Sequence, residues 1–212
     1  MADNPHRALI VFDLDGTLLR GPTVCEVLAQ SLGRLPRMQE IERLKDRLQI
    51  AAAREEMAGW YRNVAPAALI ASLRTVELAP GLATGISLLR AHGFAIGIAS
   101  ITWRFAAEHF AGEWGVEHCL ATTLQASGAI DHVWPEDKAL WARDLSARLS
   151  IPLERTVAVG DSGGDYEMLR AVGTSIFVGS ESPPVQQDWL HWPAANIEHL
   201  AHHVIGTVAH LP

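Results

Sequence analysis

Cysteine is scarce in this chain of 212 residues, which contains only Cys25 and Cys119. Two cysteines without CxxC spacing exclude a disulfide framework as the basis of the fold. We expect both to be reduced thiols that fill space as small apolar side chains, as is usual in the cytoplasm.

An excess of positive charge is also lacking, because the net charge is −7 and the isoelectric point is near 5.8. Nucleic-acid backbones and anionic membranes attract basic surfaces, so neither is expected as a main partner. No apolar run reaches the ~18 residues of a membrane span. Asp13 interrupts the N-terminal stretch before a signal-peptide core could form. We therefore expect a cytoplasmic protein.

Apolar residues are plentiful, at 49% of the chain against 19% charged residues, which is typical of a globular protein. Short apolar runs, each followed by Gly, Ser or Asp, predict buried parallel strands at 8–13, 94–100, 156–162 and 174–179, and more weakly at 118–124. A helical pattern from Pro80 to Gly93 separates two of them. This alternation predicts a doubly wound α/β fold, in which ligands bind beyond the carboxyl ends of a parallel sheet.

Residues 20–78 interrupt the alternation with helical patterns alone. Apolar side chains recur there at helical spacing in three stripes, which are Val24, Val27, Leu28 and Leu32, then Ile41, Leu44 and Leu48, then Leu69, Ile70 and Leu73. We predict a small all-helical cap over residues 20–78, inserted after the first strand, and an α/β core over residues 1–19 and 79–212.

Four aspartates follow predicted strands at the edge where ligands bind. Asp13 lies where the predicted strand at 8–13 ends, and Asp15 points to the same side of an extended chain. Asp161 lies where the predicted strand at 156–162 ends, and Asp165 follows it. Two carboxylates 4 Å apart repel by about 4 kcal/mol at an effective dielectric constant of ~20, so such a cluster needs a cation. Hard oxygen ligands suit Mg²⁺ best. An Asp-Gly turn capped by Asp15 is the alternative, but it leaves Asp13 unexplained.

Two more residues suit phosphate chemistry at this edge. With a metal in place, one aspartate can attack phosphorus and form an acyl-phosphate that water hydrolyses. Lys138 can then supply positive charge, and Ser100 can donate a hydrogen bond to a phosphate oxygen. Taken alone, Ser100 and Asp165 suit helix caps equally well, and Lys138 suits a solvated first helical turn.

The sequence DLDGT at 13–17, a strand that ends in Ser, a later Lys and GDSGGD at 160–165 resemble the four motifs of the haloacid dehalogenase-like phosphatases. The resemblance covers about residues 8–180 and implies that family's Rossmann-like core. It implies that Asp13 attacks phosphorus and binds Mg²⁺. It also implies that Asp15 protonates the leaving oxygen, later activates water, and lends its backbone carbonyl to the metal.

The same resemblance implies roles for the later motifs. Ser100, Lys138 and the backbone amide of Ile101 would hold the phosphoryl group. Asp161 would bind Mg²⁺ directly, and Asp165 would act through a metal-bound water or by fixing the lysine.

The position of the helical insertion is similar to that in the phosphoserine-phosphatase-like branch of the family. In that branch an acidic residue shortly after the first motif binds the substrate's amino group. Direct counting puts Pro22 at this place, with Glu26 one helical turn later. Ile101 and Gly164 also replace the usual Gly and Asn, which argues against phosphoserine as the substrate.

Glu26, Arg54 and Arg62 are the predicted substrate contacts within the cap. The sequence thus predicts a Mg²⁺-dependent phosphatase of a small phosphorylated metabolite. A phosphomutase or phosphotransferase with the same aspartyl-phosphate chemistry and a noncatalytic metabolite-binding module on the same fold are the alternatives. Dehalogenation is disfavoured, because it needs neither a metal nor an acid at Asp15.

Overall fold

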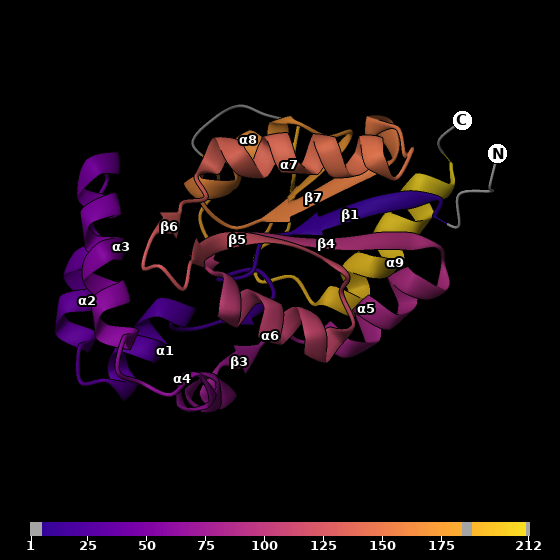
Figure 1. The fold of residues 1–212 in the computed structure, drawn as a ribbon. Helices are drawn as coiled ribbons and strands as arrows, with labels where there is room; N and C mark the ends of the chain where they lie inside the picture. The colour runs from indigo at the N-terminus through magenta and orange to yellow at the C-terminus, as the bar shows by residue number, and fades with distance from the viewer. Residues whose placement is uncertain (1–5, 184–187, 211–212) are drawn as a thin grey trace.

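The computed structural model describes residues 6–183 and 188–210 and is built around a mostly parallel sheet of seven strands (Figure 1). The strands lie in the order β6, β5, β4, β1, β7, β8, β9. Their bounds are β1 (Ala8–Phe12), β4 (Phe94–Trp103), β5 (His118–Leu124), β6 (Ile130–Asp131), β7 (Thr156–Gly160), β8 (Thr174–Phe177) and β9 (Leu190–His191). All neighbouring pairs are parallel except β5 and β6. The predicted doubly wound sheet is confirmed.

Strand β1 is the central strand of the sheet, and all five of its residues are apolar and buried. Alternate side chains serve opposite faces: Ile10 and Phe12 join one hydrophobic cluster, and Leu9 and Val11 join the other. The predicted strands are all present, but β4 continues three residues beyond Ser100, with a register shift between Ala99 and Trp103.

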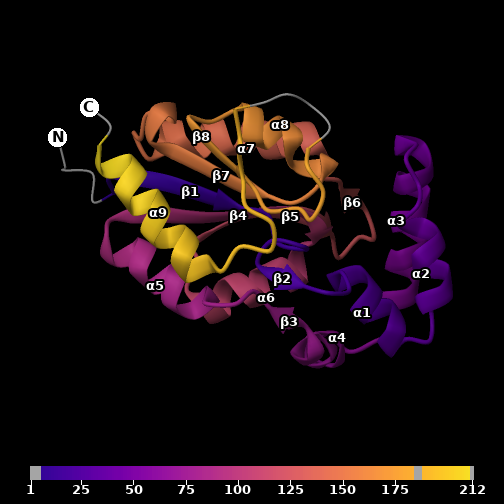
Figure 2. The ribbon, with the colours of Figure 1, turned by 180° about the vertical axis from the view of Figure 1, so that it is seen from behind.

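Helices cover both faces of the sheet (Figures 1 and 2). One face carries α5 (Leu82–Ala91), α6 (Arg104–Trp114) and α9 (Ile197–Ala209). The other carries α7 (Pro135–Arg148) and α8 (Tyr166–Arg170), with the short 3₁₀ turns η2 (Leu153–Arg155) and η3 (Gly163–Asp165). Among the described residues, no helix combines the length and the apolar character that crossing a bilayer requires.

The insertion after β1 lies beyond the carboxyl ends of the central strands (Figure 1). It contains α1 (Val24–Ser31), α2 (Leu35–Ile41), α3 (Arg47–Tyr61), α4 (Pro66–Ser72) and the 3₁₀ turn η1 (Leu73–Thr75). Its apolar residues, such as Leu28 and Met57, belong to the same continuous cluster as Phe12 of the sheet. The division into separate cap and core domains stays a prediction.

Two details of the insertion differ from the sequence prediction. The segment is not purely helical, because β2 (Leu19–Arg20) and β3 (Glu77–Leu78) pair as an antiparallel ribbon where the chain enters and leaves it. The prediction that Ile41, Leu44 and Leu48 form one apolar stripe along a helix is also wrong. Helix α2 ends at Ile41, α3 starts anew behind its N-cap Asp46, and the side chain of Leu48 is 80% exposed.

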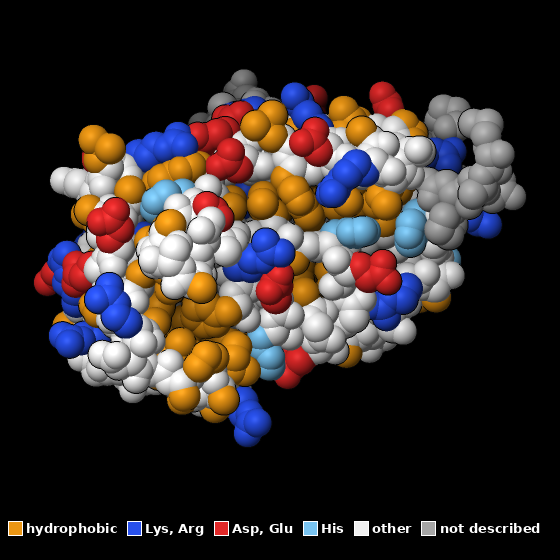
Figure 3. All heavy atoms as spheres, viewed as in Figure 1, with side chains coloured by type: hydrophobic (Ala, Val, Ile, Leu, Met, Phe, Trp, Pro, Cys, Tyr) orange, Lys and Arg blue, Asp and Glu red, His pale blue; other side chains and the backbone are white. Residues whose placement is uncertain are grey.

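The surface and the thiols give two further observations. Acidic and basic side chains are interspersed over the face shown in Figure 3, so the net negative charge is not gathered into one patch there. Cys25 and Cys119 are unpaired and partly buried, in line with the prediction of reduced thiols. The cytoplasmic location stays a prediction.

Candidate active site

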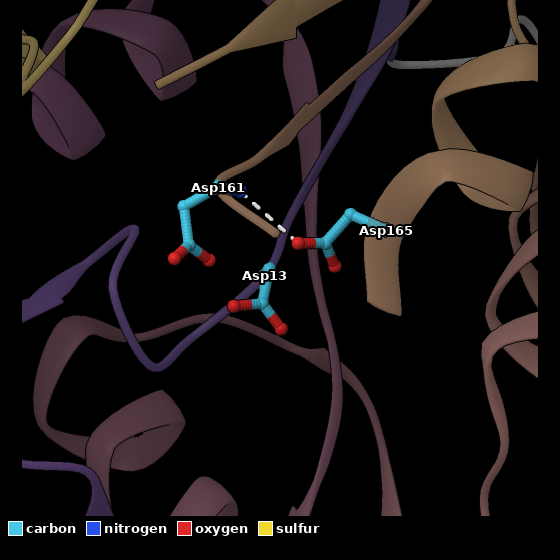
Figure 4. Close-up of side chains that lie close together, drawn as sticks. All are labelled: Asp13, Asp161 and Asp165. Carbon is cyan, nitrogen blue, oxygen red and sulfur yellow. Dashed lines mark hydrogen bonds between the residues drawn. The ribbon is translucent and has the colours of Figure 1, made fainter. Parts of the chain in front are cut away.

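Three aspartates from separate segments meet at the carboxyl edge of the sheet (Figure 4). Asp13 follows β1, Asp161 follows β7, and Asp165 ends η3, and each offers a carboxylate oxygen within 4.8 Å of the others. The neighbouring strands β1 and β7 bring them together, and the amide of Asp13 donates to the carbonyl of Val159 at 2.9 Å. The parallel sheet thus gathers acids that lie about 150 positions apart in the chain.

Lys138 lies between two of these acids. Its Nζ is 2.6 Å from Oδ1 of Asp13 and 2.5 Å from Oδ1 of Asp165, and the residue is 1% exposed. Burial alone would lower the pKa of Lys138, but the two carboxylates outweigh it and raise this pKa above its ordinary value. The lysine is therefore a buried cation, and the solvated alternative is wrong.

Asp165 fixes the local backbone as well as the lysine. Its Oδ2 accepts hydrogen bonds from the amides of Asp161 and Ser162 at 3.0 and 3.1 Å, and from Oγ of Ser162 at 3.3 Å (Figure 4). Its side chain makes no capping hydrogen bond to α8. Asp165 therefore does not cap α8 with its side chain, but its Oδ2 completes the capping box of η3 while its Oδ1 binds the lysine.

The remaining carboxylate oxygens fit a divalent metal. Oδ1 of Asp161 is buried and has no hydrogen-bond partner in the described part of the chain. Burial, followed by the charge of Asp165, raises the pKa of Asp161 to about 6 and that of Asp13 well above its ordinary value. Three acids against one lysine leave an excess of negative charge, and hard oxygen ligands suit a cation such as Mg²⁺.

Asp15 stands apart from the three clustered acids. Its Oδ1 accepts a hydrogen bond from the amide of Val24, the first residue of α1, at 2.8 Å. Burial raises the pKa of Asp15 to about 7, although this hydrogen bond opposes the shift. Three of the four predicted carboxylates thus form the cluster, and the role of Asp15 stays a prediction. The extended strand ends at Phe12 and the chain turns at Gly16, whose φ is 79°, so Asp15 is not part of the acid cluster.

Ser100 lies within β4 and is 1% exposed. Its Oγ accepts from the amide of Thr102 at 3.3 Å, which leaves its hydroxyl hydrogen for another acceptor. It does not cap the next helix, because α6 begins at Arg104 with Trp103 in the capping position. Ile101 is 43% exposed, and its carbonyl accepts from Oγ1 of Thr122 at 3.0 Å.

Arg54 of α3 reaches from the insertion to the sheet and is 7% exposed. Its Nη2 donates to the carbonyls of Ile101 at 3.3 Å and Val133 at 3.1 Å, and its Nη1 lies 3.1 Å from Nδ1 of His132. The guanidinium also lies 4.6 Å from the ring centre of Trp134. The insertion is therefore held close to the segments that carry Ser100 and Lys138.

The family model of the haloacid dehalogenase-like hydrolases matches residues 10–170, which include every residue placed at this site. The chain belongs to this family. A model of sucrose-6F-phosphate phosphohydrolase also matches residues 134–208.

Curated relatives of this chain include two bacterial phosphoserine phosphatases. SerB2 of Mycobacterium tuberculosis is 31% identical over 180 residues, which cover 80% of this chain and 44% of that protein. The enzyme of Streptomyces coelicolor is 27% identical over 208 residues, which cover 91% of this chain and 48% of that protein. The chain thus spans about half the length of these relatives.

Solved structures agree on the fold of this chain. A phospho-aspartyl intermediate analogue of phosphoserine phosphatase superposes with a TM-score of 0.77 at 17% identity, over 93% of this chain and 99% of that one. A hydrolase of the same superfamily from Salmonella enterica gives a TM-score of 0.79 at 24% identity, over 92% and 71% of the two chains.

The other predicted substrate contacts, Glu26 and Arg62, lie in different surroundings from Arg54. Glu26 belongs to the capping box of α1, where its Oε2 accepts from the amide of Thr23 at 2.9 Å. Arg62 is exposed at the C-terminal end of α3, and no contact among the described residues joins it to the acids. The structure brings only Arg54 of these three against a site segment, and their contacts with substrate stay predictions.

Sequence reasoning missed Arg20 and Trp134. Trp134 precedes α7, and the guanidinium groups of both Arg47 and Arg54 lie over its ring, at 4.3 and 4.6 Å. Arg20 binds two backbone carbonyls that lie far apart in the chain. Arg20 follows the first motif closely, which was the one available signal, whereas nothing in the local sequence marks Trp134.

Proposed function

We propose that this protein is a Mg²⁺-dependent phosphomonoester hydrolase that acts on a small phosphorylated metabolite through an aspartyl-phosphate. One observation carries the proposal: the buried carboxylate of Asp13 lies 2.6 Å from the buried ammonium of Lys138 and beside the unpartnered oxygen of Asp161. A nucleophile for phosphorus, a cation for the phosphoryl oxygens and a metal ligand are thus adjacent.

The side chains of Asp13 and Asp161 and the backbone carbonyl of Asp15 would hold Mg²⁺. When bound, the ion would neutralise charge on the phosphoryl oxygens. Asp165 contributes by holding Lys138 and the amide of Asp161, which is the second of the two roles that the family resemblance implies.

The chain's own groups account for both halves of the reaction. A carboxylate oxygen of Asp13 forms a bond to phosphorus while the bond from phosphorus to the leaving oxygen breaks, and Lys138 and Ser100 bind the phosphoryl oxygens. Asp15, whose pKa is about 7, gives its proton to the leaving oxygen. Asp15 then takes a proton from water as the water oxygen attacks phosphorus, and inorganic phosphate leaves Asp13.

The substrate is proposed as a class, small phosphate esters. The curated relatives are named for phosphoserine, but here the carboxylate of Glu26 is engaged by its own helix and Pro22 stands where the branch has an acid. Phosphoserine is therefore one candidate within the class.

The test is phosphate release from a panel of esters that includes p-nitrophenyl phosphate, O-phosphoserine and sugar phosphates, with purified protein and MgCl₂. We expect release from at least one ester, and none after Asp13→Asn. An inactive but folded wild-type protein across the panel would overturn the proposal. Transfer of the phosphoryl group to a second alcohol, without release, would instead favour a phosphotransferase.

A further inference from the structure

Arg20 lies on β2, where the chain leaves the catalytic turn for the helical insertion. Its Nη1 donates to the carbonyl of Gly16, and its Nη2 donates to the carbonyl of Ala195 at 3.1 Å. The two carbonyls are 179 positions apart in the chain. One planar guanidinium therefore ties the turn after the first motif to the loop before α9.

One tied segment packs directly against Asp161, and the other is bonded to a segment that does. A Cβ added at Gly16 would lie 2.2 Å from Oδ2 of Asp161, so this turn rests directly on the carboxylate. A Cβ added at Gly179 would lie 2.3 Å from the backbone oxygen of Asp161. The loop that Arg20 holds is bonded to this second segment, because the amide of Ala194 donates to the carbonyl of Val178 at 3.0 Å.

The positive charge of Arg20 lies close enough to Asp161 and Glu77 to be stabilised by their negative charges. Burial lowers the pKa of Arg20, and the negative charges of Asp161 and Glu77 oppose that shift. The guanidinium is thus attracted to Asp161 although the two are not within the 4.0 Å of an ion pair, and two of its five N–H groups donate to carbonyls. It offsets part of the repulsion among the clustered acids and leaves the oxygens of Asp161 free for a metal.

We propose that Arg20 is a positioning residue for the metal centre. It binds the turn that carries the backbone carbonyl of Asp15 and lies against the carboxylate of Asp161, and it ties this turn to the loop that is bonded to the segment behind Asp161. It would thereby fix two of the three ligand groups before Mg²⁺ binds. The proposal rests on the Mg²⁺ site of the proposed function. Groups that orient metal ligands from behind typically change metal affinity by roughly tenfold to a hundredfold when removed.

The experiment measures Mg²⁺ binding directly, by titration calorimetry and by the rise of the melting temperature with MgCl₂, alongside the Mg²⁺ dependence of phosphate release. We expect Arg20→Gln to weaken Mg²⁺ binding roughly tenfold or more. We expect Arg20→Lys to remain weakened severalfold, because one ammonium cannot span both carbonyls.

Arg90→Gln is the matched control, because Nη2 of Arg90 also donates to two backbone carbonyls, those of Trp114 and Gly115 at 2.8 and 3.0 Å, away from the site. It should bind Mg²⁺ like the wild type. Unchanged binding in a folded Arg20→Gln variant, or equal weakening in the control, would overturn the role of Arg20. Failure of the wild type to bind Mg²⁺ would instead count against the proposed function.

Discussion

The acid cluster at the carboxyl edge of the sheet and the contacts between the sheet and the insertion both bury charged groups, but these groups have different partners. At the edge, Lys138 is matched by the carboxylates of Asp13 and Asp165. Toward the insertion, Arg54 is bound by carbonyls, a histidine nitrogen and an aromatic ring, and Asp15 by the amide of Val24. Neither has an ion-pair partner within 4.0 Å among the described residues.

The buried charge of Lys138 is thus neutralised by opposite charges, whereas Arg54 and Asp15 have only neutral hydrogen-bond partners. A buried pair holds its geometry because removing one partner leaves the other charge uncompensated. An unpaired group keeps its capacity for a ligand or a proton, as the pKa of about 7 for Asp15 illustrates. We therefore expect substitutions at the edge to affect stability and chemistry together, and those toward the insertion to affect function mainly.

The largest effect should follow from removing the paired cation with Lys138→Met. We expect a loss of about 3 to 5 kcal/mol in the free energy of unfolding at pH 7.5, because two buried acids lose their partner. Phosphate release should fall by roughly a thousandfold, because a phosphoryl-binding charge is lost. Urea denaturation and steady-state kinetics measure the two effects.

Lys45→Met is the control for this prediction, because Lys45 is exposed and is the chain's other lysine. It should leave stability and activity near the wild-type values. A Lys138→Met variant that is as stable and as active as the control would contradict the expectation that the ion pairs of Lys138 hold the acid cluster together.

An intermediate effect should follow from Arg54→Gln, which removes the cation that reaches from the insertion to the sheet. We expect kcat/KM to fall about tenfold to a hundredfold, because hydrogen bonds from a charged group to the segments that carry Ser100 and Lys138 are lost. The melting temperature should change much less than in Lys138→Met.

Arg62→Gln on the same helix is the matched test of the sequence prediction. Its exposed position leads us to expect kinetics within about twofold of the wild type, as for most surface substitutions. Equal losses in both variants would show that charge on α3, and not the contacts of Arg54, matters.

The smallest effect concerns pH and the unpaired acid. Asp15 must carry a proton to protonate a leaving alkoxide, so kcat/KM for an alkyl phosphate should fall about tenfold per pH unit above its pKa of about 7. With p-nitrophenyl phosphate, whose phenolate leaves without a proton, the decline should be shallower. An identical alkaline limb for both esters would remove Asp15 from the role of acid.

Much of the fold and part of the site could be predicted from local patterns. Apolar runs predicted the strands, and Asp13 and Asp161 follow strands whose ends a parallel sheet must bring together, while Lys138 lies in the first turn of a predicted helix. The direction of Asp15 could not be predicted, because it depends on the turn at Gly16. The ribbon of β2 and β3 has only two residues per strand, too few to produce a periodic signal.

Long-range contacts explain the remaining misses. Arg20 and Ala195 are 175 positions apart, and Arg54 and His132 are 78 apart, so no local pattern records either contact. Leu48 was predicted to be apolar core because it continues a helical spacing, but the chain breaks between α2 and α3 and exposes it.

The two short strands β2 and β3 bring the beginning and the end of the helical insertion together. Leu19 pairs with Leu78, and Arg20 pairs with Glu77. The chain therefore enters and leaves the insertion at one fixed place, whatever the length of the segment between the two strands. We therefore expect that the sequence between Gly21 and Val76 can be exchanged to change the substrate preference of the proposed reaction, while the acids on the sheet keep their places.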